Sequence, residues 1–129
     1  MKLSLFEICD GLPLNCEMLA GAYDYLRITP PFREWNLPDS EDVEFRVTLS
    51  HDQGEHEMAG RGRRRHHIIR VSSRCIGHTD SLMMVMAHEM QHMHQDRTDQ
   101  STQAEHNAAF VMDARVVCAW HGWDLKLYL

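Results

Sequence analysis

The sequence predicts a small α+β domain. Three observations carry this prediction: the chain has 129 residues, three stretches show the apolar spacing of helices, and two others have the pattern of strands. The elements follow the order helix, strand, strand, helix, helix. We therefore expect a short β-sheet packed against a helix that carries a histidine motif and against a second long C-terminal helix.

The first predicted helix covers residues 14–28, where apolar side chains recur at helical spacing: Leu19, Tyr23 and Leu26. Asn15 is suited to cap its N-terminus. The two prolines in residues 29–32 end it, because proline cannot continue a helix. Residues 33–42 contain Pro38 and several acids, so we expect a loop.

Two strands are predicted next. Residues 43–49 alternate, with one side of the strand apolar: Val43, Phe45, Val47 and Leu49. Residues 50–65 are polar and contain glycines, which predicts a long turn or hairpin tip. Residues 66–73 are rich in β-branched side chains and predict the second strand.

The last two predicted elements are long helices. One begins near Thr79 or Asp80, either of which could cap it, and runs to about residue 95. The other covers residues 103–121, with Ser101 or Thr102 as the expected cap. Gly122 suits its C-terminal end, because glycine readily adopts the left-handed conformation found there.

Composition indicates a cytoplasmic protein. No N-terminal signal peptide is recognisable, and no apolar stretch approaches the roughly 18 residues of a membrane span, so we expect no membrane partner. The four cysteines are scattered, which argues against a zinc ribbon: Cys9, Cys16, Cys75 and Cys118. In a reducing compartment we expect them to be small core residues or unpaired thiols.

The net charge of −6 is distributed unevenly. The stretch 58–79 has no acid and six arginines, at positions 61, 63, 64, 65, 70 and 74, so the remainder carries 7 basic against 19 acidic residues. Such a block can attract DNA or another anionic partner, with Arg61, Arg63, Arg64 and Arg65 as the candidate contacts. The alternative is a solvated loop whose arginines pair with the protein's own acids.

The segment His88-Glu89-Met90-Gln91-His92 matches HExxH. On a helix, residues i and i+4 lie one turn apart on the same face, so His88 and His92 can bind one zinc ion. Glu89 lies about 100° around the helix, where it can serve as a general base without binding the metal. Chance produces this pattern in such a composition about once in twenty sequences, which makes the motif moderate evidence on its own.

A catalytic zinc ion needs a third protein ligand. The spacing HExxHxxGxxH fails, because positions 95 and 98 are Gln and Thr. Further along the chain, His106 and Glu105 are adjacent near the start of the next helix. We expect His106 to complete the site, with Glu105 as the alternative. Asp113 lies on nearly the same helix face as His106 and could accept a hydrogen bond from a ligand imidazole, although a plain surface role is the simpler interpretation.

The HExxH segment, followed after 13 residues by His106-Asn107-Ala108-Ala109-Phe110, resembles the SprT-like (Spartan-type) zinc metallopeptidases. In that family an HExxH helix is followed by an HGxxF-like element, and Asn107 stands where glycine is common. The resemblance implies one minimal zincin domain over residues 1–129, with an N-terminal helix and loop over 1–42 and the zincin core over 43–121. It implies one Zn²⁺ ion held by His88, His92 and His106, with Glu89 as the catalytic base. The small size suits a phage or mobile-element protein.

The resulting functional prediction is a zinc metallopeptidase acting on protein substrates, and the family resemblance adds DNA-associated proteins as a substrate class. An extended substrate could pair with an edge strand, for which we expect the 66–73 strand. Candidates for the oxyanion donor are Tyr128, Tyr23, His121 and an arginine. Two alternatives remain: a metal-stabilised module that binds nucleic acid or a protein without catalysis, and a metal-free regulator.

Overall fold

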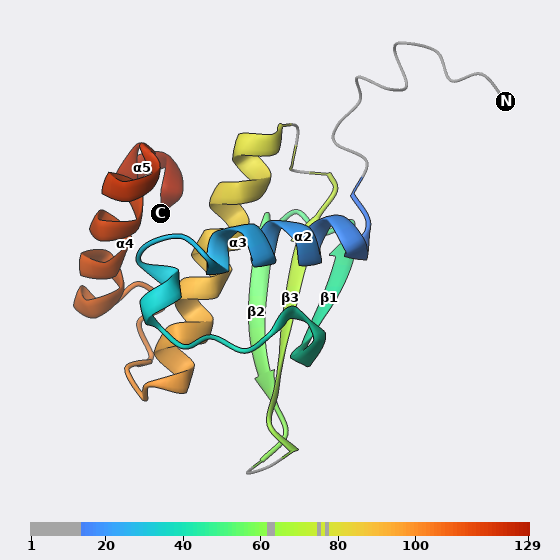
Figure 1. The fold of residues 1–129 in the computed structure, drawn as a ribbon, viewed down its shortest axis with the longest axis horizontal. Coiled ribbons are helices and arrows are strands. Elements are labelled where there is room, and N and C mark those ends of the chain that lie inside the picture. The colour runs from blue at the N-terminus through green and yellow to red at the C-terminus, as the bar shows by residue number, and fades with distance from the viewer. Residues whose placement is uncertain (1–13, 62–63, 75, 77) are drawn as a thin grey trace, which may run out of the picture.

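The computed structural model describes residues 14–61, 64–74, 76 and 78–129. The elements are α2 (Cys16–Arg27), β1 (Val43–Thr48), β2 (Gly54–Ala59), β3 (His66–Ser72), α3 (Thr79–Arg97), α4 (Ala108–His121) and α5 (Leu125–Tyr128), with short 3-10 turns at Phe32–Glu34 and Ser40–Asp42. Figure 1 shows this α+β arrangement, which confirms the predicted fold class.

The three strands form one mixed sheet in the order β1-β3-β2. β3 pairs with β1 in parallel and with β2 in antiparallel orientation. Because β3 lies between two partners, most of its side chains are buried on both faces of the sheet. The prediction that this strand is an edge was therefore wrong, and β2 is the edge strand beside α3.

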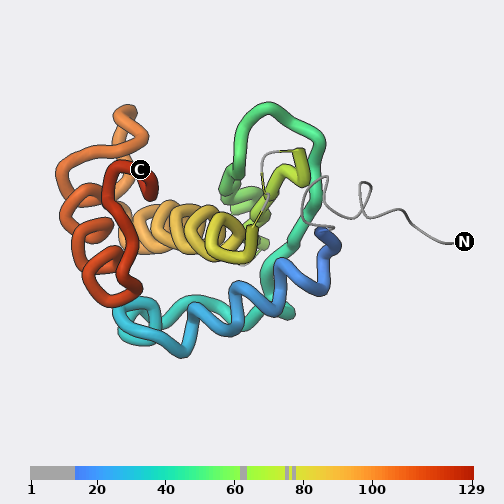
Figure 2. The backbone as a smooth tube through the Cα atoms, turned by 90° about the horizontal axis from the view of Figure 1, so that it is seen from above, coloured from blue at the N-terminus to red at the C-terminus, as the bar shows by residue number. Residues whose placement is uncertain are grey.

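Helix α3 is the central element of the molecule. It packs against β2 and α2 on one side and against α4 on the other, and α2 crosses in front of the sheet (Figures 1 and 2). Its buried side is rich in methionine, and Met86, Met90 and Met93 are fully buried. Long unbranched apolar side chains suit this position, because they fit an irregular space between two layers. This packing fixes the helix on which the HExxH motif lies.

The N-terminal helix and the first strand lie close to their predicted positions. The Asn15 side chain accepts a hydrogen bond from the Met18 amide and caps α2, as expected. Val43 is buried, and the Phe45 ring meets Tyr23 edge-on, with ring centroids 5.5 Å apart. Leu49 was predicted to be buried but is 71% exposed, because β1 ends one residue earlier.

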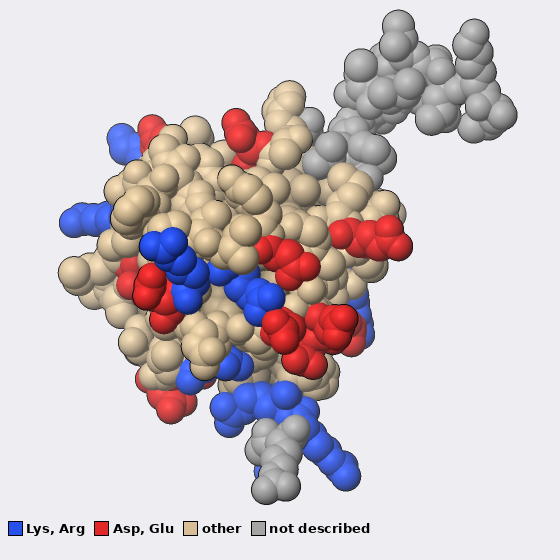
Figure 3. All heavy atoms as spheres, in the orientation of Figure 1, with Lys and Arg blue, Asp and Glu red and all other residues tan. Residues whose placement is uncertain are grey.

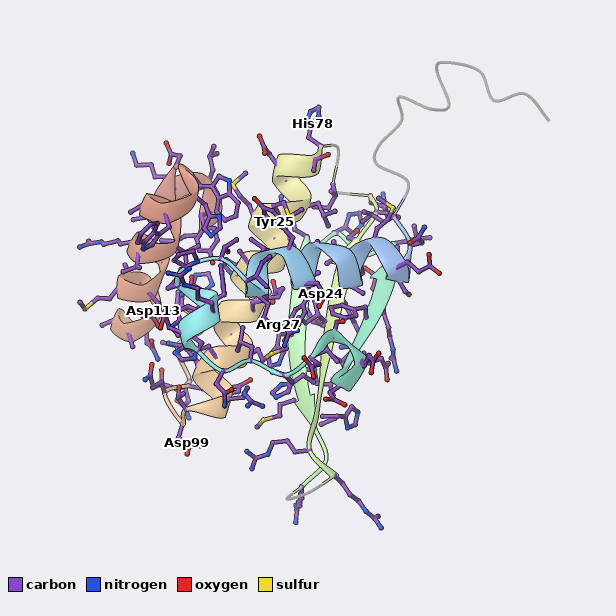
Figure 4. The ribbon with its side chains drawn as sticks, viewed as in Figure 1. Asp24, Tyr25, Arg27, His78, Asp99 and Asp113 are labelled. Carbon is purple, nitrogen blue, oxygen red and sulfur yellow. The ribbon has the colours of Figure 1, made fainter. Side chains whose placement is uncertain are left out.

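Two predicted boundaries and one predicted cap were wrong. The expected long turn over residues 50–65 contains β2, whose polar residues pair across the sheet with β3. Helix α3 begins at Thr79, and its N-cap position is His78, labelled in Figure 4, with no side-chain cap from Thr79 or Asp80. The last long helix begins at Ala108 rather than at residue 103, because Asn107 provides the cap. It ends at Gly122 as predicted, with φ of 73°.

Within the described part of the chain, none of the helices combines the length and apolar character needed to cross a lipid bilayer. Cys16 and Cys118 are free thiols, in agreement with the sequence, while Cys9 and Cys75 lie outside the described residues. The first 13 residues also lie outside them.

Candidate metal centre

The two histidines of HExxH lie one turn apart on α3. Their side chains sit at the edge of its buried side, and both are only partly exposed. The Nε2 atoms of His88 and His92 are 3.3 Å apart. The predicted i, i+4 geometry is therefore present, and both imidazoles point to one place.

His106 joins this pair from the loop between α3 and α4. Its Nε2 atom lies 3.2 Å from Nε2 of His88, and the donor atoms of the three histidines all lie within 4.8 Å of one another. In a tetrahedral site with Zn–N bonds of about 2.0–2.1 Å, ligand nitrogens are about 3.3 Å apart. Two of the nitrogen–nitrogen distances thus match a shared ion. Glu105, the alternative third ligand, is not part of this group.

The ring of Phe110 forms the base of the histidine cluster. It is fully buried and stacks on His106 with ring centroids 4.6 Å apart and on His92 at 4.4 Å. His88 meets the same ring at 5.1 Å, tilted by 63°. One rigid aromatic side chain thereby restricts the orientation of all three imidazoles.

The loop that carries His106 is fixed by the neighbouring Asn107. The Asn107 Oδ1 atom accepts hydrogen bonds from the Phe110 amide at 2.9 Å and from Gln95 Nε2 at 3.1 Å. Its Nδ2 atom donates to the Gln100 carbonyl at 2.9 Å. One side chain thus caps α4 and ties the loop to α3. A glycine at this position could provide neither contact.

The second nitrogen of His88 has a defined partner. His88 Nδ1 lies 2.9 Å from the backbone carbonyl of Tyr128 in α5, so Nδ1 carries the proton and donates it. Nε2 is then the unprotonated atom and is free to bind a metal. Asp113 had been considered for such a supporting role. Figure 4 labels it on α4, and its histidine neighbour is His94 rather than a member of the cluster.

Burial shifts the pKa values of His88 and His92 and the pKa of the adjacent glutamate in opposite directions. Burial, followed by the neighbouring His92, lowers the pKa of His88 to about 4, and burial followed by His106 lowers that of His92 to about 4. Both imidazoles are therefore neutral at pH 7, as metal ligands must be. Burial, with Glu55 and Glu105 nearby, raises the pKa of Glu89 to about 8.

The cluster opens into a cleft of about 1100 Å³ that lies between β2, α3, the loop before α4 and α5. His88, Glu89, His92 and His106 all line it. Gly54 at the start of β2 allows the strand to approach the helix closely. A Cβ atom there would lie 2.6 Å from Val85 Cγ1 and 3.1 Å from Glu89 Oε2. The missing side chain therefore leaves the space in which the Glu89 carboxyl sits.

A second polar group lines the same cleft and was not anticipated. His56 on β2 places Nε2 2.8 Å from Nδ1 of His67 and Nδ1 3.2 Å from the Asp96 carboxylate. Its side chain is 1% exposed, and burial lowers its pKa to about 4. The alternation of Gly54, His56 and Met58 in a polar strand was the only sequence signal for this inward-facing residue.

Three of the candidate oxyanion donors are engaged elsewhere. The Tyr128 hydroxyl donates to Gln91 Oε1 at 2.7 Å, and the Tyr23 hydroxyl donates to the Pro38 carbonyl at 2.5 Å. His121 Nε2 lies 3.0 Å from the Pro30 carbonyl. No Lys or Arg is among the described residues that line the cleft, so an arginine donor is also without support.

Comparison of the chain with models of known protein families and with curated proteins finds no match. What the structure shows directly is a small α+β domain and, among the described residues, a cluster of three histidines that could hold a metal ion.

Proposed function

We propose that this protein is a zinc-dependent peptidase of the SprT-like type, which hydrolyses peptide bonds in protein substrates. The observation that carries the proposal is the convergence of three imidazole nitrogens, with separations of 3.3 and 3.2 Å for two pairs, beside a buried glutamate in an open cleft. The proposal treats residues 1–129 as one domain and residues 43–121 as its zincin core.

The donor set fits zinc. Three neutral imidazoles with one remaining coordination position are a known catalytic zinc arrangement. His88, His92 and His106 would hold the ion, and the Tyr128 carbonyl would keep His88 in the required tautomer. When bound, zinc polarises the scissile carbonyl and lowers the pKa of the attacking water.

Glu89 is the proposed general base. The residue is 5% exposed, and its raised pKa of about 8 lies near neutral pH, where a group can both accept and return a proton. Glu89 would take a proton from the attacking water and deliver it to the amine of the leaving strand. A nearby divalent cation would favour its charged form, which is the form that accepts the proton.

The edge strand β2 is the proposed substrate platform. Among the residues that the structure describes, β2 pairs only with β3 and on one side, and Gly54, Glu55, His56 and Glu57 line the cleft. An extended peptide laid along its free side would form main-chain hydrogen bonds with it and cross the histidine cluster. Flexible segments of proteins can supply such an extended stretch, so they are the expected substrates.

The test compares the wild-type protein with Glu89→Gln. Both should bind about one zinc ion per chain, because Glu89 is not a ligand, and only the wild type should cleave an unfolded protein such as reduced casein. The loss in kcat should be about 10²-fold or more, as expected for a general base. Equal cleavage by both proteins would contradict the role of Glu89. Bound zinc without cleavage by the wild type would favour the metal-stabilised binding module instead.

A further inference from the structure

Two buried histidines of the sheet have no part in the proposed reaction. The His56 side chain on β2 is 1% exposed, and His67 on β3 is 4% exposed. His56 Nε2 lies 2.8 Å from His67 Nδ1, so the two rings satisfy each other on one side. Burying polar groups costs free energy unless they are hydrogen-bonded, so the remaining contacts of this pair indicate its role.

The other ring nitrogen of His56 faces α3. His56 Nδ1 lies 3.2 Å from Asp96 Oδ2, a close electrostatic contact that is not aligned as a hydrogen bond. The His56 ring is neutral at pH 7, because burial, followed by His67, lowers its pKa to about 4. A carboxylate attracts an N–H and repels a lone pair, so the single proton is favoured on Nδ1, and Nε2 accepts from His67. His67, His56 and Asp96 thus form a chain from the central strand to the cleft.

Asp96 continues this chain into the loop between α3 and α4. Its Oδ1 atom accepts a hydrogen bond from the Ser101 hydroxyl. The next residue, Thr102, has its Oγ1 atom 3.3 Å from Asn107 Nδ2, and Asn107 directly follows His106. The path from the middle of the sheet to the third ligand of the proposed metal site therefore consists of contacts between neighbouring groups.

The Asp96 contacts lie beside the metal site. Asp96 is four residues after His92, so both side chains project from one face of α3, one turn (about 5.4 Å) apart. His56, Asp96 and Ser101 line the same cleft as the three histidines of the cluster. The Asp96 carboxylate therefore meets both the sheet and the loop at the point where the cleft passes the second ligand.

The charged side chains of the surface are a different case. Figure 3 shows acidic and basic side chains spread over one face of the molecule, where water and salt screen them. The predicted basic block belongs to the surface: Arg61, Arg64 and Arg65 are exposed, Arg70 pairs with Glu55 and Glu57, and Arg63 lies outside the described residues. Asp96 differs from these groups, because its partner His56 is packed in the interior and cannot reorient freely.

We propose that His56 is a positioning residue for the metal site. Through Asp96 and Ser101 it fixes the loop that carries His106, and it thereby sets how tightly the three histidines of the cluster hold a divalent ion. His56 is not itself a ligand, since its two ring nitrogens face His67 and Asp96. The inference rests on the proposed zinc site and does not depend on peptide cleavage.

The experiment measures the zinc affinity of the full chain by competition with a chromogenic chelator. His56→Leu removes both ring nitrogens, and Ser101→Ala removes the hydroxyl on the other side of Asp96. Loss of groups that orient metal ligands typically weakens metal binding by about 10–100-fold, so each variant should bind zinc about 10-fold more weakly. The double variant should be within about threefold of the weaker single variant, because both changes act through Asp96.

Two further variants serve as a rescue and a control. His56→Asn keeps a donor, because the amide nitrogen of asparagine takes the place of Nδ1, and it should restore zinc affinity to within about threefold of wild type. Asp99→Asn removes a charge from an exposed position in the same loop, labelled in Figure 4, and should bind zinc like the wild type. Asp99 has φ of 57°, which asparagine also adopts readily, so this change should not strain the loop.

A purely structural role for His56 predicts a different result. His56→Leu would then change the urea unfolding of the metal-free protein, while the zinc affinity of the folded protein stayed at the wild-type value, and this would overturn the proposal. A loss of about 100-fold in the double variant, as for independent sites, would also overturn it. Absence of zinc binding by the wild type would refute the proposed function and this inference together, whereas equal zinc affinity of all variants would refute this inference alone.

Discussion

His88 and His106 are 18 residues apart in the sequence, yet their Nε2 atoms lie 3.2 Å apart. The chain achieves this by ending α3 at Arg97, forming a loop and starting α4 only at Ala108. His106 is therefore held by a loop and the first turn of the next helix. The position of His106 in the cluster depends on packing between α3 and α4, whereas the positions of His88 and His92 depend on the geometry of α3 alone.

Replacing His106 should separate the two possible third ligands. His106→Ala should weaken zinc binding by about 10²-fold or more, because it removes one of three protein ligands. Glu105→Ala, its neighbour in the chain, should change zinc affinity by less than about threefold. Competition with a chromogenic chelator measures both affinities under the same conditions. A larger loss of zinc affinity in Glu105→Ala than in His106→Ala would make Glu105 the third ligand.

Zinc retention should resist mild acid. Protons compete with the metal for the imidazole nitrogens only as the pH approaches their pKa values, which burial and neighbouring imidazoles lower to about 4 for His88 and His92. Zinc should therefore remain bound near pH 5.5 and be released towards pH 4, whereas ordinary histidines would begin to release it near pH 6.5. Dialysis at each pH followed by atomic absorption measures this.

The lowered pKa values of His88 and His92 also predict how the stability of the metal-free protein depends on pH. A depressed histidine pKa means that the folded state favours the neutral ring, so the contribution is present above about pH 6.5 and is lost as the pH falls towards 4. Chemical unfolding of the metal-free protein should show its free energy of unfolding declining over that interval. Zinc release centred near pH 6.5 with unchanged stability would contradict both expectations.

Gly54 should not tolerate even a methyl group. In Gly54→Ala the new Cβ atom would lie 2.6 Å from Val85 Cγ1 and 3.1 Å from Glu89 Oε2, so β2 or α3 must move. We expect a loss of about 1–3 kcal/mol in the free energy of unfolding, as for overpacked cores, and a lower kcat because Glu89 is displaced. Urea unfolding and peptide cleavage measure the two effects.

The matched control is Gly21→Ala in the middle of α2, where no atom lies within 4 Å of the added Cβ. That change should stabilise the protein by about 0.5–1 kcal/mol, because alanine is the better helix former. If Gly54→Ala behaved like Gly21→Ala, the close approach of β2 to α3 would be refuted.

The Tyr128 hydroxyl should matter for stability and not for the reaction. It donates to Gln91 Oε1 at 2.7 Å, and the fully buried Gln91 donates in turn to the Phe110 carbonyl at 2.9 Å. Tyr128→Phe leaves the Gln91 oxygen without that donor and should cost about 1–3 kcal/mol. The kcat/KM for peptide cleavage should stay within about twofold.

Tyr25→Phe on the exposed side of α2, labelled in Figure 4, is the control and should change neither quantity, since that residue is 54% exposed. A large fall in kcat for Tyr128→Phe without a change in stability would instead make this hydroxyl a participant in the reaction.

Local rules predicted the part of the site that lies within one helix. The i, i+4 spacing placed His88 and His92 on one face, and the Asn15 cap and the Gly122 stop followed from side-chain chemistry and backbone freedom. Local rules could not decide between His106 and Glu105 as the third ligand, because that choice depended on where the loop between α3 and α4 ended. Asn107 decided that point by capping α4, whereas Ser101 or Thr102 was the expected cap.

Strand β2 was beyond a pattern-based prediction. Its sequence, GEHEMA, has one strong apolar residue and no β-branched one, so its propensity favours a turn. It forms a strand because β3 supplies hydrogen bonds along its length and Arg70 pairs with both Glu55 and Glu57. The same residues place His56 towards α3. Missing the strand therefore meant assigning the edge of the sheet to β3, which lies in its middle.

The hydrogen bonds of Asn107 bear on how a metal ion would be captured. In a zinc finger the ion organises a disordered chain, so folding and metal selection are one event. Here hydrogen bonds between protein groups tie the loop carrying His106 to Gln95 and Gln100, and Phe110 stacks on the His106 ring. These contacts do not use the ion, so they would reduce the chain entropy lost on binding. Which divalent ion resides in the protein would then depend on imidazole preference and on the supply of metals in the cell.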